Sequence, residues 1–207
     1  VRSEEIVEHT FDCLCKNDTP DIVLISGDLT YNGERTSHDE MKAALKKLQQ
    51  KGKRVYVITA THDYTTPRMP TYGIDKNDKY IEVESVNRTQ LLKYYGDFGY
   101  NNAIAKHKST MSYVAQLADG YRLFALNDDY GDPDCGFSDE LMNWVKTEAN
   151  NAKRDGQYII AMTHHPLVPP SPIYAAVAKG DMLNEYELRR NQLSDLGFDF
   201  VLTGHTH

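Results

Sequence analysis

The sequence predicts an α/β fold in which mixed sheets pack against helices. The first observation is a strand, helix, strand unit near the N-terminus, which is typical of a parallel crossover. The second is that polar, histidine-rich junctions follow four strand-like runs, at the edge where open α/β sheets bind ligands. The third is the connection Ala118-Asp119-Gly120 between two strand-like runs, which indicates an antiparallel hairpin.

The first half of the chain supplies the crossover. An amphipathic helix ends near Asn17, and the apolar, β-branched run that follows it has the character of a strand buried on both faces. Ser37 begins a capping-box pattern, so we expect the next helix to start there and to end at Gly52. The expected elements are a helix to Asn17, a strand over Ile22–Ile25, a helix over Ser37–Lys51 and a strand over Arg54–Thr59.

The second half begins with an excursion from Tyr64 to about Lys108, in which we expect one short helix over Thr89–Tyr95. Ser138 is a predicted N-cap for a helix that runs through Arg154. The other expected elements are strands over Met111–Leu117, Tyr121–Asn127, Tyr158–Met162 and Phe198–Leu202, and a helix over Asn184–Leu196.

Composition narrows the class of protein. The 207 residues suffice for one domain, with 40% hydrophobic and 26% charged residues, as in ordinary globular proteins. The formal net charge of −7 disfavours a dedicated nucleic-acid binder. No apolar run approaches the roughly 18 residues that a membrane-spanning helix needs, so the sequence predicts no membrane span.

The four junctions are the candidate functional residues. They read Gly27-Asp28, Thr61-His62-Asp63, His164-His165-Pro166 and Gly204-His205-Thr206-His207, and they hold five of the eight histidines. Imidazoles with a carboxylate and no thiolate suit zinc, iron, manganese or cobalt. Each junction alone has an ordinary structural interpretation, but their order and position together favour a metal site. Paired cations would clamp the oxygens of an in-line phosphoryl displacement.

In these motifs the sequence resembles the calcineurin-like metallophosphoesterase superfamily, whose pattern is Asp-x-His, Gly-Asp, Gly-Asn-His-Asp/Glu, His-x-Pro and Gly-His-x-His. The resemblance spans Asp21 to His207. It implies a four-layer α/β/β/α sandwich with mixed sheets, and hydrolysis of small-molecule phosphoesters by a metal-activated water. It slightly favours phosphodiesters over monoesters.

The resemblance also implies roles for individual residues. Asp28 would bridge two cations, His164 and His205 would bind the second cation, and His207 would bind the first. His62 would be the general acid, a role that suits an imidazole with an unperturbed pKa of about 6.5, and Asp63 would orient its ring. His165 could line the substrate pocket or fill the variable position before Pro166.

The chain departs from the family pattern at two points. The Asp-x-His block is absent, so we expect one domain over residues 1–207 that lacks the first strand and is cut at both ends. Thr61 replaces a metal-binding Asn, so the chain would hold fewer than the two Mn, Fe or Zn ions of the family. The alternative function is therefore a degenerate member that binds metal or ligand without efficient turnover. The negative net charge of the chain disfavours a nuclease.

One further cluster has two interpretations. Asn127-Asp128-Asp129 follows a predicted strand and could approach the substrate, but such turns are commonly structural, and we favour the structural interpretation.

Overall fold

The computed structural model describes residues 3–18, 20–67, 69–77, 79–129, 134–177 and 179–206. Strands β1 (Ile22–Ser26) and β2 (Arg54–Ile58) form a parallel pair, in register from Ile22 opposite Arg54 to Ser26 opposite Ile58. The predicted parallel crossover is confirmed, with helix α2 (Arg35–Gln50) connecting the two strands.

A second sheet has five strands in sequence order. They are β5 (Ala105–His107), β6 (Ser112–Ala118), β7 (Tyr121–Ala125), β8 (Tyr158–Met162) and β9 (Phe200–Leu202). The β5–β6 and β6–β7 pairs are antiparallel, whereas β7, β8 and β9 are parallel. The expectation of an α/β fold with mixed sheets is therefore confirmed.

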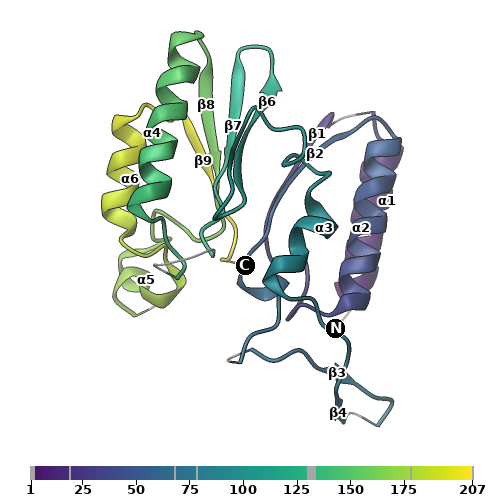
Figure 1. The fold of residues 1–207 in the computed structure, drawn as a ribbon. Coiled ribbons are helices and arrows are strands. Elements are labelled where there is room, and N and C mark those ends of the chain that lie inside the picture. The colour runs from purple at the N-terminus through teal and green to yellow at the C-terminus, as the bar shows by residue number, and fades with distance from the viewer. Residues whose placement is uncertain are drawn as a thin grey trace.

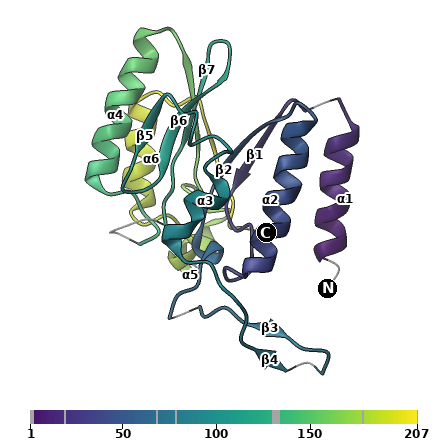
Figure 2. The ribbon, with the colours of Figure 1, turned by 45° about the vertical axis from the view of Figure 1, so that its right-hand side comes forward.

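Helices cover the sheets on their outer sides (Figures 1 and 2). Helix α1 (Ser3–Lys16), α2 and the short α3 (Leu91–Tyr95) pack with β1 and β2 around a core that includes Leu45, Leu48 and Phe98. Helices α4 (Asp139–Arg154) and α6 (Tyr186–Asp195) cover the five-stranded sheet, through residues such as Leu141 and Leu193.

A third apolar cluster lies between the two sheets. It joins Ile58 and the partly buried Leu24 to residues of the five-stranded sheet such as Tyr113, Leu123 and Met162. The hydroxyl of Tyr113 donates to the carbonyl oxygen of Val57 at 3.0 Å, which ties β6 to β2. This cluster holds the carboxyl ends of β1 and β2 next to those of β7 and β8.

The excursion contains more structure than the sequence predicted. Strands β3 (Gly73–Ile74) and β4 (Tyr80–Ile81) form a small antiparallel hairpin, which projects beyond the body of the molecule in both views (Figures 1 and 2). The expected short helix is divided into a 3-10 turn (Arg88–Gln90) and α3. Strand β5 and helix α5 (Pro172–Val177) were not predicted, since both are short and neither has a clear hydrophobic period.

The start of α2 corrects one sequence prediction. The helix begins at Arg35, with Glu34 at the N-cap, so Ser37 lies inside the helix and is not its cap. Glu34 is held in extended conformation by a β-bridge to Ser85 and uses its carboxylate to accept the N–H groups of Tyr31 and Asn32. The prediction for α4 is confirmed, because Ser138 Oγ accepts the N–H of Leu141 at 3.1 Å.

Candidate metal centre

The ends of β1, β8 and β9 bring together three of the predicted metal ligands. Nε2 of His164 lies 3.2 Å from Oδ2 of Asp28 and 3.1 Å from Nδ1 of His205. His164 is buried, and Asp28 and His205 are partly exposed. Asp28 and His164 therefore converge at one edge of the two sheets, although they are 136 positions apart in the sequence.

The protonation of His164 follows from its other nitrogen. Nδ1 lies 2.7 Å from the carbonyl oxygen of Ser26, which can only accept a hydrogen bond, so Nδ1 carries the proton. In the neutral ring Nε2 then presents a lone pair to the Asp28 carboxylate and to His205. Such an arrangement of acceptors is repulsive unless a proton or a cation lies between them.

The pKa values of the three residues reflect two opposing effects, burial and the charges of their neighbours. Burial would lower the pKa of His164, but the hydrogen bond and the charge of Asp28 outweigh it, so the pKa is raised. Burial would raise the pKa of Asp28, but His164 outweighs burial and lowers it. Burial, together with the charges of His165 and His164, lowers the pKa of His205. The raised pKa of His164 and the lowered pKa of Asp28 both favour a proton shared between these two groups.

Unusual backbone conformations occur at two of these residues. Asp28 and His205 have positive φ angles of 53° and 66°, which non-glycine residues rarely adopt and which cluster at functional sites. Gly27 precedes Asp28 with a φ of +96°, and a Cβ there would lie 2.5 Å from Ala60 Cβ and 3.0 Å from His164 Nδ1. The close approach of the two strand ends therefore requires glycine at position 27.

A buried ion pair supports the adjacent histidine, His165. Its Nδ1 lies 3.1 Å from Oδ1 of Asp128, whose Oδ2 accepts the N–H groups of His164 and His165 and the hydroxyl of Thr163. Burial would lower the pKa of His165, but hydrogen bonds to Asp128 and Cys135 raise it to about 10. Burial would raise the pKa of Asp128, but His165 outweighs burial and lowers it.

Asp128 thus fixes the backbone and one ring of the histidine pair. The sequence interpretation of Asp128 as structural is correct in kind, but it missed that this carboxylate orients residues of the site. The position of Asp128, after the strand that neighbours β8, was the signal for this role.

His62 is held from the opposite side by the loop after β1. Its Nδ1 lies 2.5 Å from the carbonyl oxygen of Tyr31 and 3.1 Å from Oδ1 of Asn32, so Nδ1 donates and Nε2 is free. The backbone N–H of His62 donates to Oδ1 of Asp28 at 3.2 Å, which links His62 to the metal cluster. The structure therefore places His62 beside Asp28, and its role as the general acid stays a prediction.

The prediction that Asp63 orients the ring of His62 is wrong. The buried Asp63 carboxylate accepts the backbone N–H groups of Leu29, Thr30 and Ala60 at 2.6, 3.0 and 2.8 Å. Burial, with help from the charge of Asp28, raises its pKa to about 7 against these three donors. Asp63 therefore fixes the loop after β1, and Tyr31 and Asn32 orient the ring instead.

The outcome for the other predicted ligands is mixed. His207 lies outside the described residues. His165 joins His164 and His205 in a cluster whose potential ligand atoms all lie within 4.8 Å of one another. The described part of the chain therefore brings together Asp28, His164 and His205, with His62 and His165 at their sides.

These residues fit a cation. Two ligand atoms bound at about 2.1 Å in tetrahedral geometry lie about 3.4 Å apart, close to the separations found around His164 Nε2. Asp28, His164 and His205 would hold this ion, and their N and O atoms suit a divalent transition metal. Asp28 has a second oxygen that could serve a further cation.

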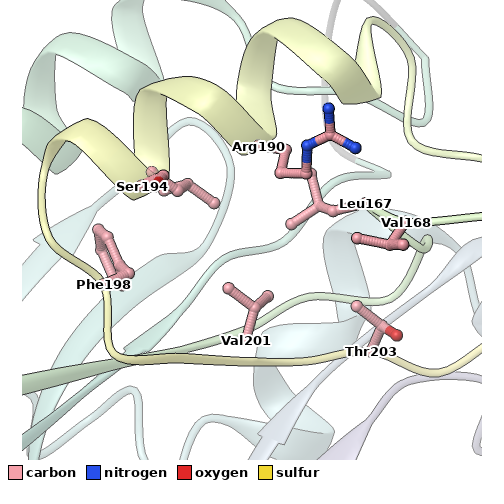
Figure 3. Close-up of a pocket in the computed structure, with 8 residues that line it drawn as sticks. Leu167, Val168, Arg190, Ser194, Phe198, Val201 and Thr203 are labelled. Atoms are coloured by element: carbon pink, nitrogen blue, oxygen red, sulfur yellow. The ribbon is translucent and has the colours of Figure 1, made fainter.

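A separate cavity lies beside the site. It has a volume of about 230 Å³ and opens between α6 and the end of β9 (Figure 3). The residues that line it are Leu167, Val168, Arg190, Leu193, Ser194, Phe198, Val201 and Thr203. None of them is a candidate ligand, so this mainly apolar cavity is distinct from the histidine cluster.

Comparison with known proteins gives the family and the fold of the chain. The family model described as calcineurin-like phosphoesterase matches residues 3–207. The chain is also similar in fold to the crystal structure of a dimetal phosphatase from Danio rerio, with a TM-score of 0.66 and 12% identity, over 100% of this chain and 72% of that one. No curated protein matches the chain significantly.

Proposed function

Because the chain belongs to the calcineurin-like phosphoesterase family, we propose that it hydrolyses phosphodiesters, with divalent metal ions at Asp28, His164 and His205 and with His62 as the general acid. Metal-dependent hydrolysis of phosphoesters is the general chemistry of this family. The preference for diesters and the role of His62 are the specific parts of the proposal.

The observation that carries the proposal is the convergence of acceptor atoms around Nε2 of His164. The Ser26 carbonyl fixes a proton on Nδ1, so in the neutral ring Nε2 of His164 presents its lone pair toward the carboxylate oxygen of Asp28 and Nδ1 of His205. A carboxylate and two imidazoles that converge in this way suit a divalent transition metal.

The chemistry divides between the cations and the protein. When bound, divalent cations lower the pKa of a water molecule and neutralise charge on the phosphoryl oxygens. Tyr31 and Asn32 hold the ring of His62 by Nδ1, so a proton carried on Nε2 can pass to the leaving alkoxide. Asp63 keeps Leu29 and Thr30 in place by accepting their backbone N–H groups.

The substrate in this proposal is a small-molecule phosphoester. The net charge of −7 disfavours the polyanionic backbone of nucleic acid. Among the helices that the structure describes, none is long and apolar enough to cross a bilayer.

A degenerate, non-catalytic member is the second candidate, and Thr61 is the observation that favours it. Thr61 begins the 3-10 turn that carries His62, where the family has an Asn whose amide oxygen is the better ligand. Thr61→Asn distinguishes the two candidates. Under the degenerate alternative, hydrolysis appears only in this variant, whereas under the main proposal the chain already hydrolyses diesters without it.

Hydrolysis of bis(p-nitrophenyl) phosphate with added Mn²⁺ tests the proposal. We expect His164→Ala to reduce the rate by at least about 100-fold and the exposed His9→Ala to leave it unchanged. Equal rates in His164→Ala and the unmodified chain would contradict the proposal, as would the absence of any Mn²⁺-dependent rate.

A further inference from the structure

Three tyrosines form a row that starts at His62. The ring centroids of Tyr31 and His62 lie 6.0 Å apart, and those of Tyr31 and Tyr72 also lie 6.0 Å apart. The Tyr72 hydroxyl lies 3.4 Å from that of Tyr31, and the Tyr72 and Tyr80 rings meet edge to face at 4.7 Å. We call Tyr31, Tyr72 and Tyr80 the tyrosine row.

Packing does not account for the tyrosine row. Tyr31 and Tyr80 are 62% and 73% exposed, whereas Tyr95 and Tyr113, which do pack in the core, are 3% and 1% exposed. Exposed aromatic rings that touch one another form an apolar surface with a polar rim of hydroxyl groups. Such contiguous surfaces are typical of binding sites, whereas single exposed apolar residues need no explanation.

The row is fixed relative to His62 by hydrogen bonds at its base. Thr71 Oγ1 donates to the carbonyl oxygen of Asn32 at 2.5 Å, and the N–H of Val86 donates to that of Gly33 at 2.8 Å. These bonds attach both ends of the β3–β4 hairpin to the loop whose Tyr31 carbonyl holds Nδ1 of His62. The segment that carries the hairpin is long, and long ordered loops are usually functional.

The position of the row determines which part of a substrate it meets. His62 Nδ1 is occupied by Tyr31 and Asn32, so the acid acts through Nε2, and the leaving group departs on the side of His62. Tyr31 is the next ring beyond His62, and the β3–β4 hairpin projects beyond the body of the molecule (Figures 1 and 2). A group attached to the leaving oxygen lies near His62, and Tyr31 is the ring of the row that is next to His62.

From this arrangement we propose that the tyrosine row is a subsite for a planar aromatic ring on the leaving-group side of the phosphoester. This inference rests on the proposed role of His62. Tyrosine rings contact an aryl or nucleobase ring through their faces and edges without reading its identity, and such a contact strengthens binding about fivefold or more. The ring could belong to an aryl ester or to a nucleotide.

Calorimetric titration of the Mn²⁺-loaded chain separates the aromatic contribution from binding of the phosphoryl group. The aryl pair is phenylphosphonate and methylphosphonate, and the nucleotide pair is AMP and ribose 5-phosphate. We expect the aromatic member of at least one pair to bind about fivefold or more tightly. The pair that shows the difference identifies whether aryl or nucleobase rings are preferred.

Substitutions in the tyrosine row test whether these side chains cause the difference in affinity between the aromatic and the non-aromatic ligand. Tyr72→Leu and Tyr80→Leu, which both lie outside the contacts of His62, should abolish the preference for the aromatic ligand and leave binding of methylphosphonate and ribose 5-phosphate unchanged. Tyr158→Leu is the matched control, because Tyr158 is 57% exposed and stacks on Tyr121 at the opposite ends of the strands. It should keep the preference.

The outcomes that overturn each proposal differ. Equal binding of aromatic and non-aromatic ligands by the unmodified chain would overturn the tyrosine subsite but leave the metal centre intact. If both tyrosine variants still bind the aromatic ligand more tightly, the tyrosine subsite is likewise overturned and the metal centre is left intact. If no phosphonate or phosphate binds in the presence of Mn²⁺, the proposed function fails, and this inference fails with it.

Discussion

His164 and Asp28 face each other across 3.2 Å through Nε2 and Oδ2, and both atoms accept hydrogen bonds when the His164 ring is neutral with its proton on Nδ1, facing the Ser26 carbonyl. The contact joins the end of β1 to the end of β8, so it depends on the fold and cannot form locally. A cation bound between these two atoms would compete with a proton for the lone pair of Nε2. Metal binding should consequently weaken at low pH.

Gly27, after β1, lies close to Ala60, after β2, and to His164, after β8, so Gly27→Ala should strongly reduce the stability of the chain. The new Cβ would lie 2.5 Å from Ala60 and 3.0 Å from His164, in addition to the strain of a φ of +96°. Gly52→Ala is the matched control, since Gly52 has a φ of +82° and no neighbour within 4 Å of a new Cβ. Gly52→Ala should lower the free energy of unfolding by roughly 1–2 kcal/mol, from backbone strain alone.

Gly27→Ala should lower the free energy of unfolding by at least about 1 kcal/mol more than Gly52→Ala, because of overpacking. It should also weaken Mn²⁺ binding, which Gly52→Ala should not affect. Urea unfolding and metal titration of the two variants measure these effects. Equal stability losses would show that the strand ends separate easily, contrary to this account.

Asp128→Asn tests how far the buried carboxylate positions the histidine pair. Asn keeps the volume but replaces one accepting oxygen, so the bonds from Thr163, His164 and His165 cannot all be kept. Loss of such a supporting group typically reduces metal affinity by about 10–100-fold. Asp155→Asn removes a surface carboxylate that pairs with Arg122 and should leave metal affinity unchanged. Unchanged affinity in Asp128→Asn would limit Asp128 to packing.

The role of His62 predicts a dependence on the leaving group. A poor leaving group such as an alkoxide needs a proton, so His62→Gln should slow hydrolysis of alkyl diesters by about 10²–10⁴-fold. A p-nitrophenolate leaves without one, so the same variant should slow that substrate far less. Steady-state rates on both substrates check this, and an equal loss on both would show that His62 acts in another way.

Because the pKa of His38 is lowered by burial, the stability of the chain should depend on pH. It is buried in α2, with Nδ1 2.5 Å from the Tyr95 hydroxyl and Nε2 2.9 Å from the carbonyl oxygen of Asp63. Burial lowers its pKa, although the Asp63 carbonyl and the charges of Glu34 and Asp39 oppose this. The unfolded chain therefore binds the proton more readily, so the stability that His38 contributes is present above the unfolded pKa of about 6.5 and is lost as pH falls below it.

Urea unfolding at pH 7.5 and pH 5.5 measures this effect. His38→Gln should show a smaller loss of stability between the two pH values than the unmodified chain. If both chains lose the same stability, His38 is not the group responsible.

Much of the fold follows from local patterns. The apolar run of β1 and the cap at Ser138 predicted their elements because each signal is contained in a few neighbouring residues. The start of α2 was misplaced because Glu34 is held by Ser85, a contact that the helix sequence does not contain. The β3–β4 hairpin was missed because two-residue strands have no period to detect.

The candidate site was predictable in its residue types and not in its supporting contacts. Placing Asp28 and His164 at strand ends required only the strand predictions. The hydrogen bonds of Asp63 to the backbone, of His62 to Tyr31 and of His165 to Asp128 depend on how loops from different strands approach one another. Side chains at adjacent sequence positions, such as His62 and Asp63, can therefore serve different partners.

The central claim is that a divalent cation binds between Asp28, His164 and His205, and anomalous diffraction from crystals of the Mn²⁺-saturated protein tests it most directly. The account predicts a manganese peak within about 2.0–2.3 Å of Oδ2 of Asp28, Nε2 of His164 and Nδ1 of His205. Absence of a peak among these three atoms, or a peak bound only by other residues, would contradict it.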